Sequence, residues 1–159
     1  MSISPRLSSY LDQRGARFDI CAHAHSRTSA QTARVAHVPT HQIAKAVIVE
    51  DDSGCVMTVV PADWKVKLGE LSRMLARKHL RLADENRIAT LFSECDRGAI
   101  PGFGMAWGVE TIVDDALEAC DIVYVEGGDH ECLVRMSHEQ FHDLMRDARH
   151  GQFSGAPTH

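Results

Sequence analysis

Hydrophobic and polar positions in the first part of the chain form short periodic segments that predict helices and strands. Apolar residues follow Ser4-Pro5 at helical spacing, and this pair is a typical helix start. Gly15 ends that segment, and residues 18–22 predict a short strand. The pattern Thr28-x-x-Gln31 has the form of a capping box and predicts a second helix.

The next two segments predict a β-hairpin. Residues 43–49 form a short, largely β-branched apolar segment that favours a buried strand over a helix. Residues 51–54 read Asp-Asp-Ser-Gly, which is typical of a tight turn, and residues 55–60 predict the returning strand.

The second half of the chain continues the mixture of helices and strands. An apolar stripe predicts a helix near residues 68–75, Asp84 can cap another short helix, and three further strands are expected at residues 110–113, 122–125 and 131–136. Ser137-x-x-Gln140 is a capping box, and the helix that it opens is expected to continue to Gly151. We therefore expect one α/β domain, residues 1–151, followed by a flexible tail, residues 152–159.

Lys45 interrupts the apolar strand at 43–49. Because side chains alternate along a strand, Lys45 shares a face with Val47 and Val49. An ammonium group in such a segment is costly to desolvate unless it has a partner or faces water. Two interpretations remain at this point: a strand-end lysine that reaches solvent, and a lysine at the floor of a site for an anionic or carbonyl-bearing ligand.

Composition limits the partners. The 159 residues carry a net charge of −5, which argues against a protein that coats nucleic acid, and we expect neither DNA nor a membrane as a partner. The sequence has no signal-peptide core or membrane-length apolar segment, so we expect a cytoplasmic protein. One basic segment, residues 64–82, could meet a phosphate backbone, although a solvated helix face is the alternative. Its cations are Lys65, Lys67, Arg73, Arg77, Lys78 and Arg81.

Cysteines and histidines suggest no cofactor. The five cysteines form no C-x-x-C pair, and we expect free thiols that pack as small hydrophobic groups. Three histidine pairs have loose metal-ligand spacing, but no cysteine or carboxylate constellation accompanies them, so we expect no native metal site. These pairs are His23 with His25, His37 with His41, and His138 with His142.

Residues 98–104, Gly-Ala-Ile-Pro-Gly-Phe-Gly, predict a loop whose backbone N–H groups are exposed and whose shape is restricted by Pro101. Such a loop can hold a carbonyl oxygen, a phosphate or a water molecule. We expect it to position groups rather than to fill the core.

Five segments in order resemble the YbaK/ProX family of aminoacyl-tRNA editing domains, which includes the domain inserted in bacterial prolyl-tRNA synthetases. They are Q-I-A-K-A-V-I-V, V-V-P-A-D, G-A-I-P-G-F-G, I-V-D-D-A-L and G-G-D-H, and the match runs from about residue 22 to residue 144. The resemblance implies an α/β fold with a curved, barrel-like mixed sheet surrounded by helices. It also implies hydrolysis of mischarged tRNA in trans without a cofactor, in association with an aminoacyl-tRNA synthetase. The alternative is a non-catalytic module that binds tRNA or a synthetase.

The resemblance also implies the site residues. Lys45 matches the family's essential lysine, Asp114 matches the acidic residue after the following strand, and His130 matches a histidine near the terminal adenosine. The loop matches a G-x-x-x-P motif, although its glycine and proline are one residue closer together here. The loop positions expected to bind substrate are Gly98, Ala99, Ile100, Pro101, Phe103 and Gly104, and the pattern adds Thr28, Val47 and Ile100 as residues that line the pocket.

The segments contain no Ser-His-Asp or Cys-His pair at a recognisable spacing. Ester hydrolysis can proceed without one, because a positioned water and donors for the developing oxyanion are sufficient.

Overall fold

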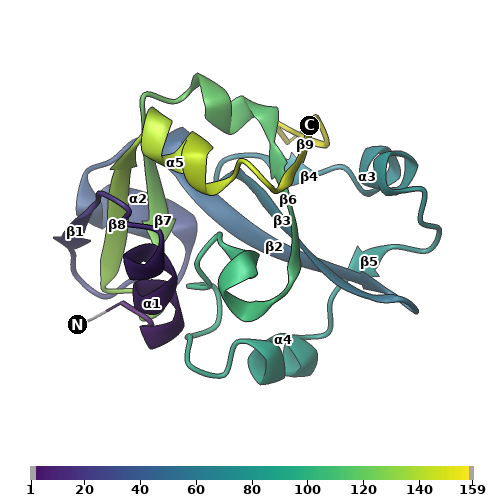
Figure 1. Ribbon diagram of the computed structural model, residues 1–159, viewed down its shortest axis with the longest axis horizontal. Coiled ribbons are helices and arrows are strands. Elements are labelled where there is room, and N and C mark those ends of the chain that lie inside the picture. Colours follow the sequence, from purple (N-terminus) through teal and green to yellow (C-terminus); the bar gives the residue numbers. More distant parts are fainter. Residues whose placement is uncertain (1–2, 158–159) are drawn as a thin grey trace.

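The computed structural model describes residues 3–157 and places a mixed β-sheet at the centre of one α/β domain (Figure 1). The helices are α1 Pro5–Gln13, α2 Ser29–Ala36, α3 Leu68–Leu75, α4 Glu85–Leu91 and α5 His138–Leu144, with short 3-10 helices η1 Thr40–Gln42, η2 Gly104–Trp107 and η3 Asp115–Ala119. The strands are β1 Asp19–Ala22, β2 Ile43–Asp51, β3 Gly54–Pro61, β4 Lys65–Val66, β5 Arg81–Leu82, β6 Glu110–Asp114, β7 Ile122–Glu126, β8 Cys132–Ser137, β9 Arg149–Gly151 and β10 Ser154–Gly155.

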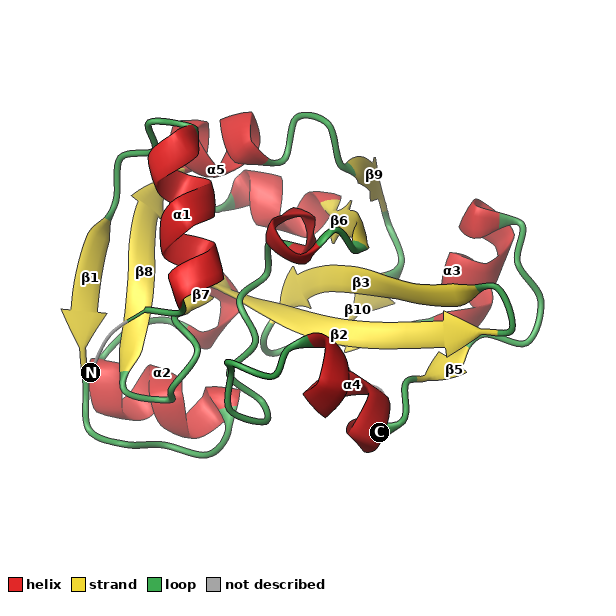
Figure 2. Cartoon of the chain, turned by 60° about the horizontal axis from the view of Figure 1, so that its bottom comes forward, coloured by secondary structure: helices red, strands yellow, loops and turns green. Residues whose placement is uncertain are grey.

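The sheet has the order β1-β8-β7-β2-β3-β6-β9, and β5 also pairs with β2. The pairs β2–β7, β3–β6 and β6–β9 are parallel, and the others are antiparallel. Figure 2 shows β1 and β8 nearly upright beside the horizontal β2 and β3, so the sheet twists strongly. The mixed sheet confirms the expected α/β fold class. The sheet is open, however, because β1 and β9 lie at opposite ends of the order and it does not close into a barrel.

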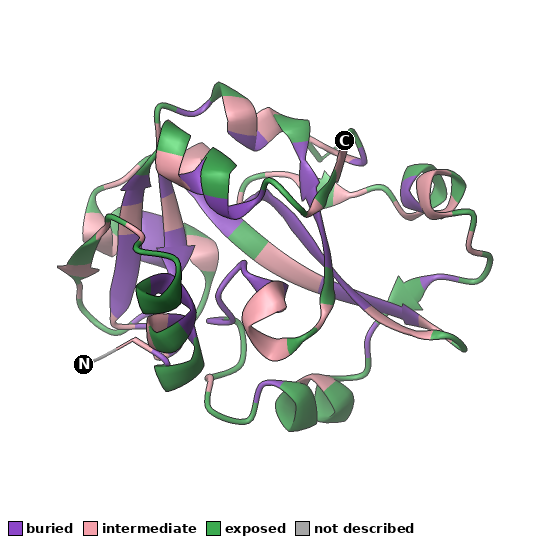
Figure 3. Ribbon diagram, viewed as in Figure 1, coloured by how far each residue is buried: buried purple, intermediate pink, exposed green. Residues whose placement is uncertain are grey.

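Alternation along β2 divides the apolar residues between two core clusters. Ala44 and Ile48 belong to the larger cluster, which also contains buried residues of α1, β7, β8 and α5. Val49 belongs to the smaller cluster beside α3, and Val47 packs against it. The predicted alternation of this strand is therefore confirmed, and Figure 3 shows the central strands largely buried while α4 is largely exposed.

Capping interactions form at three of the predicted helix starts. Thr28, Asp84 and Ser137 accept hydrogen bonds through their side chains from the backbone N–H groups of Gln31, Asn86 and Gln140 respectively. Ser4 occupies the N-cap of α1, but its hydroxyl makes no capping hydrogen bond.

The C-terminal segment differs from the expectation. Helix α5 ends at Leu144 rather than at Gly151, and β9 pairs in parallel with β6. Phe153 is buried, with 1% of its surface exposed, and β10 pairs with β4. The expected flexible tail is thus wrong for residues 152–155, which pack onto the domain, whereas residues 158–159 lie outside the described residues.

The basic segment is not one helix. Lys65 lies in β4, Arg81 lies in β5, and only Arg73 lies within α3. Arg77 follows α3 and donates hydrogen bonds to both carboxylate oxygens of Asp51 and to the Gly54 carbonyl. Arg77 therefore holds the β2–β3 turn, and its guanidinium is not available to a ligand.

Among the described residues, no helix has both the length and the apolar character needed to span a membrane.

Candidate functional site

Lys45 lies in a cleft of about 230 Å³ between β2 and the segments that contain β5, α4 and the loop at 97–100. Strand β2 provides one wall, and the opposite wall comes from residues far along the chain. The cleft is lined by Lys45, Ala46, Val47, Ile48, Leu82, Ala83, Glu85, Ile88, Arg97, Gly98 and Ile100. The structure thus brings together the predicted lysine and part of the predicted glycine loop.

The cleft follows an open stretch of the edge of β2. On this side, β7 pairs with β2 at Ile43 and Ala44, and β5 pairs with it at Val49 and Glu50. No described strand pairs with the β2 edge between these two contacts. The cleft exists because two short partners share one long strand and leave a gap between them.

Lys45 is exposed, and it forms no ion pair with a described residue. The apolar strand therefore does not bury Lys45, and the cost of desolvating its ammonium group is avoided because the residue is exposed. An exposed lysine that lines a cleft and has no ion-pair partner among the described residues can bind a phosphate or polarise a carbonyl.

The glycine loop is more buried than its composition predicts. Within residues 98–104, only Gly98 is exposed, and its φ of +80° favours glycine. Phe103 is fully buried and packs near Tyr10 and Phe141. A Cβ atom on Gly104 would lie 2.4 Å from the Thr111 hydroxyl oxygen, so this glycine permits close packing. The expectation that the loop exposes its backbone and does not fill the core is wrong beyond Gly98.

Two of the six predicted loop positions reach the cleft. Gly98 and Ile100 line it, and Val47 lines it from β2, as the pattern suggested. The cleft-lining residues do not include the buried positions Ala99, Pro101, Phe103 and Gly104.

His130 lies behind the loop rather than on the cleft surface. Only 5% of its surface is exposed, and its Nε2 is hydrogen-bonded to the Arg97 carbonyl. A Cβ on Gly98 would lie 3.4 Å from the His130 Cε1 atom, so the imidazole packs directly against that glycine. With Nε2 as the donor to Arg97, the imidazole fixes the position of residues 97 and 98.

Asp114 and Thr28 have structural contacts away from the cleft. One Asp114 carboxylate oxygen caps η3 through the Ala116 N–H, and the other accepts hydrogen bonds from the Phe153 N–H and the Ser154 hydroxyl. Thr28 caps α2 through Gln31. Neither residue is among those that line the cleft.

Sequence reasoning missed the two charged residues opposite Lys45. Arg97 and Glu85 line the cleft and form an ion pair, with 3.2 Å between Nε and Oε2. Leu82, which also lines the cleft and has 62% of its surface exposed, was missed as well. The cleft therefore combines two cations, one carboxylate and several apolar side chains.

The lining residues include no serine, threonine, cysteine or histidine, so they provide no side-chain nucleophile of the usual kinds. The cysteines are free thiols, as expected. Burial raises the pKa of Cys95 to about 11 and that of Cys132 to about 12, so both remain protonated near neutral pH. A larger hollow of about 680 Å³ lies beside residues 16–19 and 135–137, but it contains none of the predicted site residues.

The family model for the aminoacyl-tRNA editing domain matches residues 23–144, well over half of the 159 residues. The chain belongs to the aminoacyl-tRNA editing domain family. This membership confirms the resemblance found in the sequence, and the matched range includes every residue that lines the Lys45 cleft. No curated protein matches the sequence significantly.

Solved structures share the fold of this editing domain. A candidate trans-editing enzyme for prolyl-tRNA synthetase superposes with a TM-score of 0.83 at 21% identity, over 98% of this chain and 100% of that chain. The hypothetical protein APE2540 superposes with a TM-score of 0.84 at 22% identity, over 94% of this chain and 99% of that chain. A candidate signal transduction protein from Marinobacter aquaeolei VT8 superposes with a TM-score of 0.73 at 19% identity, over 94% of this chain and 30% of that chain. At these identities the similarity shows the fold alone.

Proposed function

We propose that this editing domain hydrolyses the ester bond between a tRNA and a wrongly attached amino acid, and that it acts in trans. The observation that carries the proposal is Lys45, an exposed lysine without an ion-pair partner among the described residues, which lines a cleft in an editing-domain fold. Action in trans is supported by the match to the full length of a chain described as a candidate trans-editing enzyme.

In the proposed complex, the aminoacyl group lies in the cleft and the rest of the tRNA stays outside. A volume of about 230 Å³ is below the ~300–1,000 Å³ of sites for drug-sized ligands, so it suits one small group. Val47, Ile48 and Ile100 provide apolar walls. These features favour a small, uncharged amino acid side chain as the substrate.

The proposed reaction is a direct attack of water on the ester carbonyl carbon. Lys45 holds the carbonyl oxygen or the terminal phosphate and stabilises the negative charge that develops there. The tRNA oxygen then leaves and takes up a proton, which restores the 3′ end. This route agrees with the absence of a side-chain nucleophile among the lining residues, and His130 acts as a positioning residue that fixes the loop at residues 97 and 98.

A deacylation assay on a panel of mischarged tRNAs tests the proposal. Wild-type protein is expected to release small uncharged amino acids, and Lys45→Ala should lower kcat/KM by about 100- to 1,000-fold, which corresponds to ~2.7–4 kcal/mol for one lost oxyanion donor. Lys45→Arg should keep only part of the activity, because a planar guanidinium does not replace a compact ammonium group.

The melting midpoint of Lys45→Ala should match that of the wild type, because the side chain is exposed and lacks an ion-pair partner among the described residues. Arg146→Ala removes an exposed cation on the segment after α5 and serves as a charge control. Normal turnover by Lys45→Ala would contradict the catalytic role. Binding of tRNA by the wild type without turnover of any substrate would favour the alternative, a non-catalytic binding module.

A further inference from the structure

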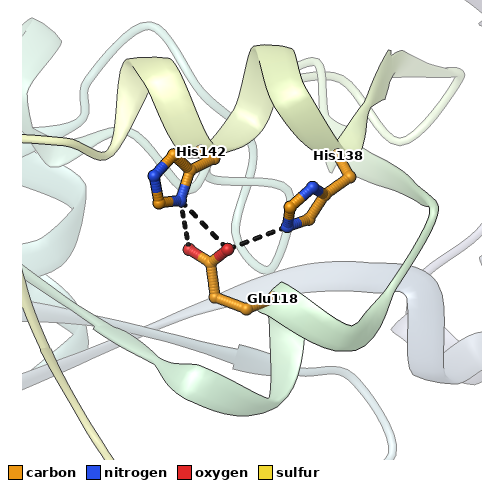
Figure 4. Close-up of side chains that lie close together, drawn as sticks. All are labelled: Glu118, His138 and His142. Atoms are coloured by element: carbon orange, nitrogen blue, oxygen red, sulfur yellow. Dashed lines mark hydrogen bonds and ion pairs between the residues drawn. The ribbon is translucent and has the colours of Figure 1, made fainter.

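A second group of reactive side chains lies on the α5 side of the molecule, remote from the Lys45 cleft. His138 and His142 are one turn apart on α5, and both contact the Glu118 carboxylate of η3 (Figure 4). The His138 Nε2 atom lies 2.9 Å from Oε2, and the His142 Nδ1 atom lies 2.9 Å from Oε1 and 3.0 Å from Oε2. One ligand atom from each residue lies within 4.8 Å of the other two.

The backbone around this group is held by buried residues. Leu117 anchors η3 in the larger core cluster, and Phe141 anchors α5 in the same cluster. The His138 N–H also donates a hydrogen bond to the Asp121 carbonyl, which joins the start of α5 to the residue before β7. The three polar side chains therefore converge from a fixed framework and remain partly accessible to solvent.

These atoms are the types that bind zinc. Imidazole nitrogens and carboxylate oxygens bind Zn²⁺ at about 2.0–2.2 Å, which places neighbouring ligand atoms about 3.4 Å apart in a tetrahedral site. The nitrogen–oxygen separations of 2.9–3.0 Å need to widen by only a few tenths of an ångström. The segment from His138 to His142 also reads His-Glu-Gln-Phe-His, the i, i+4 spacing by which two helical histidines bind one zinc ion.

His150 adds a separate observation. Its Nδ1 atom lies 4.0 Å from the Glu118 Oε1 atom, and its Nε2 is hydrogen-bonded to the Met145 carbonyl at 2.9 Å. Because the Met145 carbonyl can only accept, Nε2 carries the hydrogen of this bond, and in the neutral imidazole Nδ1 then has a lone pair on the side of Glu118. A histidine that binds a metal commonly donates its other N–H to a backbone carbonyl in this way, which fixes the tautomer.

We propose that Glu118, His138 and His142 bind one divalent transition-metal ion of the zinc class, with His150 as the fourth ligand. The sequence pattern led us to expect no metal site, because Glu118 lies 20 residues before His138 and is not an obvious partner. No Lys or Arg ion pair with Glu118 is found among the described residues, so its charge is available to a cation.

The metal would stabilise the structure and would take no part in ester hydrolysis. None of the four ligands lines the Lys45 cleft, and Figure 1 places α5 and α4 at opposite sides of the view. A bound ion would join η3 and α5, and through His150 it would also fix β9. The inference is therefore independent of the proposed deacylase function.

Zinc binding to tag-free, chelator-treated protein tests the site. Competition with a chromogenic chelator is expected to show one Zn²⁺ per chain, and added Zn²⁺ should raise the melting midpoint. Co²⁺ should give the intense visible absorption of a four-coordinate site. Glu118→Gln and His142→Asn should each weaken Zn²⁺ binding by at least about 100-fold, because even the loss of a group that only orients a ligand costs about 10- to 100-fold.

His41→Asn is the matched control, because His41 is a partly exposed histidine whose Nδ1 contacts a single carboxylate, that of Asp63, at 2.8 Å. It should bind Zn²⁺ like the wild type. His150→Asn should show a smaller loss than His142→Asn. Melting of each metal-free variant verifies that it remains folded. The proposal is overturned if wild-type protein binds no stoichiometric Zn²⁺, or if Glu118→Gln and His142→Asn bind it unchanged.

Discussion

Glu126 lies at the end of β7, where 3% of its surface is exposed and neither carboxyl oxygen has a hydrogen-bond partner among the described residues. Thr32 is nearby, but its hydroxyl is already hydrogen-bonded to the Ser26 hydroxyl and the Thr28 carbonyl. Burial, with a smaller contribution from the charge of Asp129, raises the pKa of Glu126 to about 8. The side chain is therefore mostly protonated at neutral pH in the folded protein.

This raised pKa predicts a pH dependence of stability. Between about pH 4.5 and pH 8 the folded state keeps a proton that the unfolded state releases, so stability falls as the pH rises through this window. Across this window the free energy of unfolding should fall by an amount on the order of 5 kcal/mol, at ~1.4 kcal/mol per pKa unit. Glu126→Gln cannot ionise and should remove this slope, as measured by chemical denaturation from pH 4 to pH 9. An unchanged slope would show that Glu126 does not titrate in this range.

Gly98 has a backbone conformation and a neighbour that both restrict substitution. Gly98→Ala places a side chain at a φ of +80° and adds a Cβ 3.4 Å from the His130 imidazole. We expect kcat for deacylation to fall by about tenfold or more, because small displacements of positioning groups are costly. Gly108→Ala has the same kind of strain, at a φ of +70°, with no atom within 4 Å of the added Cβ, and it should keep its turnover. Equal kcat values for the two variants would show that the position of the loop at Gly98 does not affect catalysis.

At the scale of elements, the basic segment separates into cations with different roles. Lys65, Lys67 and Lys78 are exposed, whereas Arg77 is bound to Asp51 and lowers the pKa of that carboxyl group to about 2. Arg77→Ala should therefore lower the melting midpoint, and it is unsuitable for testing tRNA binding.

Replacing the three exposed lysines by glutamine should raise KM for tRNA and flatten its dependence on salt. If each lysine contacts one phosphate, the slope of log(1/KM) against log[salt] should become shallower by about 2–3. A charge-matched variant with Arg6, Arg17 and Arg146 replaced by glutamine is the control. The same slope in all three proteins would indicate that the lysines form only a solvated surface.

Local patterns in the sequence predicted the elements better than their ends and contacts. Alternation correctly placed Lys45 with Val47 and Val49 on one face of β2, because that information is contained within the strand. Helical periodicity past Leu144 was misleading, because pairing of β9 with β6 ends the helix. Long-range pairings of this kind have no local signature.

The candidate site was predicted only in part for the same reason. Lys45, Gly98 and Ile100 were predicted as site residues because they belong to local sequence motifs, and all three line the cleft. Arg97 and Glu85 come close to Lys45 only because β5 and β7 leave part of the β2 edge open, and a local motif does not contain that information. Asp114 was assigned to the substrate from the family resemblance, and its contacts with Phe153 and Ser154, 39 and 40 residues along the chain, have no local sequence signal.

At the scale of the whole molecule, Phe153 joins the C-terminal segment to the smaller core cluster. It is 1% exposed and packs in the cluster that contains Val56 and Leu71. Phe153→Ala should reduce the free energy of unfolding by ~3–5 kcal/mol, as is typical when a buried phenylalanine is truncated. Gln152→Ala changes the exposed neighbouring residue and should stay within ~0.5 kcal/mol. Denaturant titration measures both, and a Phe153→Ala value near zero would mean that the segment is dispensable.

The parallel pairing of β9 with β6 also has a consequence for folding during synthesis. A nascent chain that has emerged only as far as α5 lacks β9, which is one of the two strand partners of β6, and it also lacks the side chain of Phe153. Its smaller core stays open to solvent, and the edge of β6 stays unpaired, which favours association between incomplete chains. The ribosome must therefore release residues 149–155 before the domain can close, so we expect ribosome-bound intermediates to depend on chaperones until that point.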